Sequence, residues 1–193
     1  MKNILLSFVF GVSLCVLTFS SVAMDLKQSG IKGGINWANL TGEDTENTDT
    51  ATLYTVGGFA VLNLSSKTKL RPEVLYTKKG YDANFLGMSF DARLTYLEIP
   101  ILFQHNLPSR NRDNVANVFI GPALGFLLSA KAAGIDVKNQ TESTEVSLHF
   151  GGGTTINRKF TMDVRYSLGL TSIAHGTSDV KTTGIMATMG YLF

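Results

Sequence analysis

Apolar side chains recur at every second position over most of this chain, and this alternation constrains the fold more than any other feature. A period of two places successive side chains on opposite faces of a β-strand, whereas an amphipathic helix needs a period near 3.6. In a clear example, Leu97 and Ile99 lie on one face, and Tyr96 and Glu98 on the other. Eight such runs occur, at 29–40, 52–63, 68–79, 92–105, 115–130, 145–157, 159–171 and 182–193.

The connections between these runs alternate between long and short. Long ones include TGEDTENTDTA after the first run and GYDANFLGMSFDA after the third, whereas LSSK and NRK are short. Bacterial outer-membrane barrels have this asymmetry, with long external loops and short periplasmic turns. The sequence therefore predicts an all-β fold, an eight-stranded antiparallel up-and-down transmembrane β-barrel.

The first residues have the composition of a secretory signal peptide. Lys2 precedes a short apolar run that ends at Phe19, and small residues precede a cleavage site after Ala23. The run is shorter than the roughly 20 residues of a membrane-spanning helix. We therefore expect a cleaved signal peptide at 1–23 and one outer-membrane barrel domain at 24–193.

A lipoprotein signal at Cys15 is the alternative, but Leu14 occupies a position that prefers a small residue. Cleavage after Ala23 removes Cys15, the only cysteine, so the mature chain forms no disulfide.

Charge and motifs exclude several function classes. Without Lys2 the 17 Lys and Arg residues become 16, against 15 Asp and Glu, so no basic face indicates nucleic-acid binding. The glycine-rich segments GGINWAN and HFGGGTTI lie within strands and lead into no helix, unlike a phosphate-binding loop. No pair of histidines has metal-ligand spacing. We therefore expect no cofactor and no nucleic-acid partner.

The polar face of the strands distinguishes a membrane barrel from a soluble lipocalin-like barrel. A soluble barrel would expose many charges on that face, whereas a small membrane barrel encloses it in a narrow lumen. Here the polar face is mostly Gly, Ala, Ser and Thr, which favours an integral outer-membrane protein. Its few charges have both signs: Arg71, Glu73, Glu98, Asp163 and Arg165, with Lys32 as a further candidate.

Eight strands leave an interior just wide enough for side chains, so we expect these charges to form a buried network that fills the lumen. Arg165 with Glu73 or Glu98 is its predicted centre. The alternative is a charged lining of a pore or solute site.

Aromatic residues near strand ends predict the membrane interfaces, where amphipathic rings gather. The candidates are Trp37, Tyr76, Tyr96, Tyr166, Tyr191 and Phe193. Lipid cannot satisfy a free strand edge, so the last strand must pair with the first, and both mature termini are expected in the periplasm.

Two further features of the sequence bear on function. Glu145, Ser147 and His149 are residue types of a catalytic triad, but alternate residues on one strand lie nearly 7 Å apart, which argues against a hydrolase. The acidic segment from Thr41 to Ala51 is the best candidate for an external recognition loop, and otherwise is a solvated loop.

Several motifs resemble one known family. GIKGGINWANLTG, LRPEVLYTKKG, LEIPILFQ, FIGPALGFLLSAK and VRYSLGL resemble the PorT-like outer-membrane β-barrel domain, which is common in Bacteroidetes and related to small OmpX- and OmpA-type barrels. The founding member is associated with a secretion system for gingipain-type proteases. The terminal aromatic also resembles the signal read by the barrel-assembly machinery.

Together these features predict a non-enzymatic barrel that contacts outer-membrane lipids, the barrel-assembly machinery and envelope or secretion proteins. An accessory role in secretion, a lipid A-modifying barrel enzyme and a soluble lipocalin-like binder are the alternatives.

Overall fold

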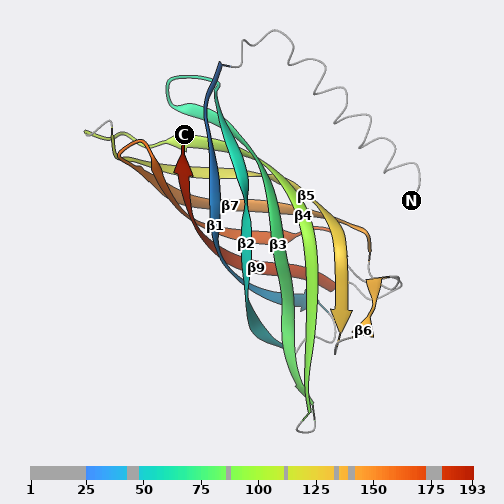
Figure 1. The fold of residues 1–193 in the computed structure, drawn as a ribbon. Helices are drawn as coiled ribbons and strands as arrows, with labels where there is room; N and C mark the ends of the chain where they lie inside the picture. Colours follow the sequence, from blue (N-terminus) through green and yellow to red (C-terminus); the bar gives the residue numbers. More distant parts are fainter. Residues whose placement is uncertain are drawn as a thin grey trace, which may run out of the picture.

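Eight antiparallel strands form the wall of a closed barrel in the computed structural model (Figure 1). They are β1 (Asp25–Gly42), β2 (Thr48–Asn63), β3 (Thr68–Phe85), β4 (Met88–Asn106), β5 (Val115–Ala132), β7 (Thr144–Ile156), β8 (Phe160–Gly169) and β9 (Val180–Leu192). Each pairs with its neighbours along the chain, and β1 pairs with β9. The two-residue β6 (Ile135–Asp136) pairs only with the end of β5. The predicted eight-stranded up-and-down barrel is confirmed.

The structure describes residues 25–42, 48–85, 88–110, 113–132, 135–138, 142–172 and 180–193. The predicted signal peptide at 1–23 lies outside these residues. So does the middle of the predicted acidic loop, whose flanks at 41–42 and 48–51 belong to β1 and β2. None of the residues described forms a helix long and apolar enough to cross a membrane.

The two ends of the barrel differ in their connections. At one end, called the turn end here, the chain passes from β2 to β3, from β4 to β5 and from β7 to β8, and the C-terminus lies there too (Figure 1). The opposite end, called the loop end, carries the remaining connections and β6. Closure reaches the turn end, because the Phe193 backbone N–H donates to the Ser29 carbonyl at 2.9 Å.

The apolar face of the strands points outward. Along β5, Val118, Ile120 and Leu124 are exposed, whereas the alternating Phe119 and Ala123 are buried. A soluble lipocalin-like barrel has the opposite arrangement, because it hides its apolar face inside.

The prediction of a long loop at 80–92 is wrong. β3 continues to Phe85 and β4 begins at Met88, with these two residues opposite each other in the ladder. The polar–apolar alternation in fact continues through this segment, for example at Tyr81, Ala83 and Phe85. Each arm supplies the hydrogen-bond partner of the other, so the hairpin continues past Ala92, where the pairing of β4 with β5 stops.

Side chains fill the lumen in layers. An apolar group near the turn end contains Phe59, Val61 and Leu192. Another group nearer the loop end contains Leu94, Tyr96, Leu127 and Ala130. The charged residues of the lumen lie largely between these two groups and belong to β1, β3, β4, β7 and β8.

Candidate functional site

A cluster of five buried ions crosses the turn-end half of the lumen. We call it the axial cluster: Lys32, Arg71, Glu73, Asp163 and Arg165. Glu73 is its centre, because Lys32 Nζ lies 3.0 Å from Glu73 Oε1 and Arg71 Nε lies 3.0 Å from the same oxygen. Arg165 donates two hydrogen bonds to the Glu73 carboxylate, at 2.9 and 3.1 Å.

Asp163 is the second anion of the axial cluster. Its carboxylate accepts from Lys32 Nζ at 2.8 Å, and Arg71 Nη2 lies 3.1 Å from the same oxygen. The guanidinium groups of Arg71 and Arg165 also lie 4.6 and 5.4 Å from the centroid of the buried Phe119 ring. A cation gains from the negative face of an aromatic ring when water is excluded.

Glycines on β7 make room for these ions. Gly151 lies opposite Arg165 in the ladder and Gly153 lies opposite Asp163. A Cβ atom at Gly151 would lie 2.7 Å from Arg165 Cα and 3.0 Å from its Cβ, and one at Gly153 would collide with the Asp163 carboxylate. The glycines of the segment HFGGGTTI therefore leave space in the wall for the side chains of Arg165 and Asp163.

A second, smaller group of ions lies toward the loop end. This loop-side cluster contains Lys79, Glu98 and Glu145. Lys79 Nζ lies 2.6 Å from Glu98 Oε1, and it donates to both Glu145 oxygens at 3.1 Å. Thr182 also donates a short hydrogen bond to Glu145. Glu98, predicted in one network with Arg165, belongs to this cluster instead.

The two clusters together are electrically neutral. Among the described residues the buried cations are Lys32, Arg71, Lys79 and Arg165, and the buried anions are Glu73, Glu98, Glu145 and Asp163. Unpaired charges in a low-dielectric interior cost several kcal/mol each, so matched numbers of the two signs let all eight stay ionised. The lumen is thus filled by charges that satisfy one another.

The sequence reasoning missed Lys79 and did not include Glu145 in the charge network. The signal for Lys79 was its position, because it shares the inward face of β3 with Arg71 and Glu73. Lys79 is the last residue of the run expected at 68–79, so the alternation beyond it was not used to assign its face. Glu145 was considered in the sequence only as a triad-type residue.

The three triad-type residues do not form a relay. Ser147 and Ser167 both lie within hydrogen-bond distance of His149 Nε2, at 3.2 and 3.0 Å. The expected separation of Ser147 and His149 is therefore wrong for these side-chain tips, which lean toward each other. Glu145 instead binds Lys79, and within the described part of the chain His149 Nδ1 has no hydrogen-bond partner.

Five of the six predicted interface aromatics share the outward face of the wall. Trp37, Tyr76, Tyr191 and Phe193 are exposed, and Tyr166 is half-buried on the same face as Val164. Tyr191 contacts the rings of Phe160 and Phe193 edge-on, with centroids 5.5 and 5.7 Å apart, beside the turn end.

Tyr96 is a correction. Its side chain is fully buried in the lumen, where the Lys79 ammonium lies 5.3 Å from its ring centroid. The reason is parity: Tyr96 shares the inward face of β4 with Glu98, so it cannot reach the lipid side.

No metal centre is suggested by the residues that the structure describes, because no group of three His, Cys, Asp or Glu side chains could hold an ion.

Comparisons with known proteins agree with this architecture. The family model described as outer membrane protein beta-barrel domain matches residues 27–175. No curated protein matches the chain in sequence. Among solved structures, Neisserial surface protein A is 14% identical with a TM-score of 0.57, and the match covers 86% of this chain and 97% of that one.

Two further solved structures are similar. Ail of Yersinia pestis is 18% identical with a TM-score of 0.49, covering 86% of this chain and 98% of that one. OprG of Pseudomonas aeruginosa is 12% identical with a TM-score of 0.49, covering 87% and 96%. Since the family model spans most of the strands, the chain belongs to the outer membrane protein β-barrel domain family.

Proposed function

We propose that this protein is a closed, non-enzymatic outer-membrane barrel that works as a scaffold, through its external loops and its periplasmic turns. The observation that carries the proposal is the neutral ion network across the lumen, in which Arg165, Glu73 and Lys79 are all buried. An open pore would need a continuous water-filled path, whereas these ions are buried and contact one another.

The packing around the network supports a closed state. The apolar layer of Phe59, Val61 and Leu192 lies toward one end, and the layer around Tyr96 toward the other. An ion that entered the lumen would have to break charge-assisted hydrogen bonds in a low-dielectric interior, where each broken pair costs about 3–5 kcal/mol.

The same geometry argues against catalysis in the lumen. His149 lies beside two serines, but Glu145 is engaged by Lys79 and Thr182, and among the described residues no carboxylate accepts a hydrogen bond from His149 Nδ1. A lipid A-modifying enzyme would also need its catalytic groups on the lipid side, whereas these side chains are buried inside.

For orientation, we propose that the turn end faces the periplasm. Short connections and the C-terminus at that end fit the periplasmic side of an outer-membrane barrel. The rings of Phe160, Tyr191 and Phe193 would then lie at the periplasmic interface, and the C-terminal strand would be available to the barrel-assembly machinery.

Single-channel recording tests the closed lumen. Purified barrel in a planar lipid bilayer is expected to show no discrete current steps in 1 M KCl. Regular steps that appear in proportion to inserted protein would contradict the proposal. Heat-modifiability on a gel verifies that the inserted protein is folded.

A role as an accessory of a secretion apparatus is the second candidate, and the motifs resembling PorT favour it. Crosslinking of whole envelopes, followed by purification of the tagged barrel, tests it. Recovery of a defined secretion complex would support this role. Recovery of lipid and assembly factors alone would contradict it and favour a scaffold that acts without a secretion partner.

A further inference from the structure

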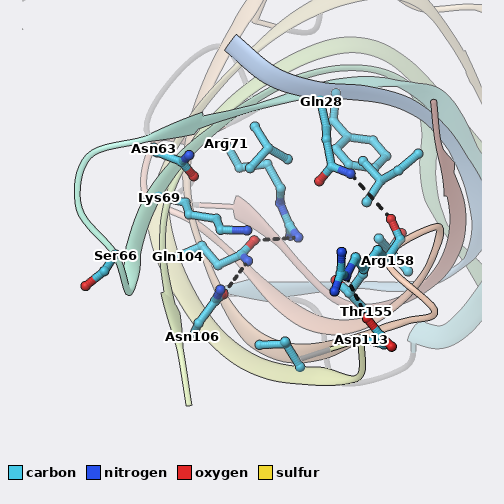
Figure 2. A pocket seen from close by; sticks show the side chains of 15 residues that line it. Gln28, Asn63, Ser66, Lys69, Arg71, Gln104, Asn106, Asp113, Thr155 and Arg158 are labelled. Atoms are coloured by element: carbon cyan, nitrogen blue, oxygen red, sulfur yellow. Dashed lines mark hydrogen bonds and ion pairs between the residues drawn. The ribbon is translucent and has the colours of Figure 1, made fainter. Parts of the chain in front are cut away.

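A cavity of about 320 Å³ opens at the turn end of the barrel, and we call it the vestibule (Figure 2). Its volume lies at the lower end of the range for small-molecule sites, roughly 300–1,000 Å³. Arg71 of the axial cluster forms part of its lining, so the vestibule stops where the ion network begins. It is a blind cavity above a charged floor.

Among the described residues that line the vestibule near its floor, Lys69 is the cation that the ion network does not use. Among the described residues its ammonium has no hydrogen-bond or ion-pair partner, although the side chain is half-buried. Figure 2 shows it extending from the wall between Asn63 and Gln104. The neighbouring Arg71 donates to Gln104 Oε1 at 3.1 Å and forms ion pairs with Glu73 and Asp163 of the axial cluster.

The charge balance near the vestibule is positive. The axial cluster alone contains three cations and two anions, because its compensating carboxylates lie in the loop-side cluster. Lys69 adds a further positive charge beside it. A half-buried ammonium above a net positive floor attracts an anion, since neither charge is well screened by water.

The opposite rim holds a second basic group in an unusual backbone conformation. Asn157 and Arg158 form the β7–β8 turn with φ angles of 51° and 58°, and the second of these positions usually favours glycine. Arg158 lies across the opening from Lys69 (Figure 2). Its Nε lies 2.7 Å from Asp113 Oδ1, and its backbone carbonyl accepts a hydrogen bond from Gln28.

Amide and apolar groups complete the lining. Asn63 and Asn106 lie near Lys69, and Asn106 Oδ1 accepts from Gln104 at 3.0 Å. Val61 and Leu192 supply an apolar wall. The carboxyl-terminal end of a peptide offers a partner for each of these groups. Its free carboxylate can bind the Lys69 ammonium, its backbone amides can bind the Asn side chains, and a small apolar side chain can contact the apolar wall.

We propose that the vestibule binds the carboxyl-terminal residues of a peptide, with Lys69 as the partner of the free carboxylate. The inference goes beyond the scaffold function, because binding at this mouth does not depend on whether the lumen conducts. Arg71 acts from the floor through its charge, and Arg158 shapes the rim.

Fluorescence polarisation with the folded barrel in detergent tests the proposal. The probe is the tetrapeptide Gly-Gly-Ala-Val, labelled at its amino terminus and ending in a free carboxylate. The matched probe is the same peptide with a carboxyl-terminal amide. We expect the free acid to bind about tenfold or more tightly than the amide, because a hydrogen bond to a charged group is lost with the carboxylate.

Variants of Lys69, near the start of β3, and of Lys67, in the preceding turn, locate the site. Lys69→Gln should weaken binding of the free acid about tenfold or more, and Lys69→Arg should keep most of it. Lys67→Gln is the control: it removes the same charge two residues away, from an exposed side chain outside the vestibule lining. It should leave the affinity unchanged at 150 mM salt, where distant exposed charges are screened.

Three results would overturn the proposal: no binding of the free acid to the native barrel, equal binding of acid and amide, or an equal loss in Lys67→Gln. Binding of inorganic phosphate that depends on Lys69, with no binding of the peptide, would also overturn it. Repeating the titration with a peptide ending in D-alanine separates a cell-wall peptide from a protein terminus, and a preference for either identifies the source. The acid–amide comparison uses the native protein, so it does not depend on the folding of a variant.

Discussion

Arg165 shows how one side chain can determine the stability of the lumen. Its guanidinium is fully buried and binds the Glu73 carboxylate through two N–H groups. The same arginine lies 3.7 Å from Asp163 and above the Phe119 ring. Removing it would leave Glu73 with Lys32 and Arg71 as its remaining partners, while the closely packed wall stays in place.

We therefore expect Arg165→Met to destabilise the folded barrel by about 3–5 kcal/mol, the usual cost of breaking a buried ion pair. Trp37 is the only tryptophan, so its fluorescence follows unfolding in urea. Adding Glu73→Gln to this variant should recover part of the loss, because it restores equal numbers of buried cations and anions in the lumen. A single-variant loss below about 1 kcal/mol would show that water reaches the lumen.

Gly151 is the matching position on the wall. A Cβ there would collide with the Val164 carbonyl oxygen and lie 2.7 Å from Arg165 Cα, so the backbones of β7 and β8 must separate. We expect Gly151→Ala to destabilise the barrel by about 1–3 kcal/mol, the cost of overpacking, in the same urea titration. Gly58→Ala is the control, since its Cβ would lie 3.5 Å from the Gly30 carbonyl, an ordinary contact. Equal effects of the two would contradict the steric argument.

Tyr96 and Lys79 show where residue-scale prediction succeeds and where it fails. The face of each strand follows from parity alone, and Tyr96 was correctly grouped with Glu98 on the polar face. The aromatic-belt rule then moved it to the lipid side, although one strand cannot place residues two apart on opposite faces. The pairing of ions across the lumen depends on the tilt and register of distant strands. A local sequence pattern does not specify tilt or register.

At the scale of the elements, β9 carries the closure of the sheet. Its ladder with β1 runs from Gly30–Leu192 to Gly42–Val180, and it also pairs with β8. Near the end, Leu192 N–H donates to the Lys159 carbonyl at 2.7 Å. These bonds hold the last residues at the turn end, where the first and last strands meet.

Deleting 191–193 should prevent formation of a heat-modifiable barrel, because β1 would expose unpaired N–H and C=O groups to lipid. Phe193→Ala is the control, since it keeps the Phe193 backbone bond to Ser29 and removes only an exposed ring. We expect it to fold with a small loss of stability. Normal folding of the truncated chain would show that closure does not require these residues.

The strand count and order were predictable because alternation survives in every strand, but the strand ends were not. The loop-end residues of β3 and β4 have polar–apolar alternation, yet their Gly, Asp and Asn content favours a loop by local preference. Mutual pairing between the two arms overrides that preference. The local composition of one arm does not show that the other arm pairs with it, so the sequence predicts a loop where the structure has a hairpin.

At the scale of the whole molecule, the outward apolar surface and the neutral lumen both follow from the alternation of residue types along the strands. Most outward positions of the strands carry exposed aliphatic and aromatic side chains, whereas the paired ions lie inside, together with buried apolar residues such as Phe59 and Tyr96. The sequence predicted this division correctly, since parity and residue size define it. The vestibule was not foreseen, because its lining comes from strands and turns far apart in the chain.

The outward face makes a prediction about depth in the membrane. Val164 lies on the exposed face in the middle of β8, whereas Phe160 begins that strand at the turn end. Val164→Arg should destabilise the barrel in liposomes by about 2–4 kcal/mol, and Phe160→Arg by about 0–1 kcal/mol, because the cost of a charge falls from the midplane to the interface. Urea titration of folding in liposomes, followed by Trp37 fluorescence, measures both. Equal costs, or a larger cost at Phe160, would mean that the middle of β8 does not lie at the centre of the bilayer, and the assignment of the turn end to one interface would fail with it.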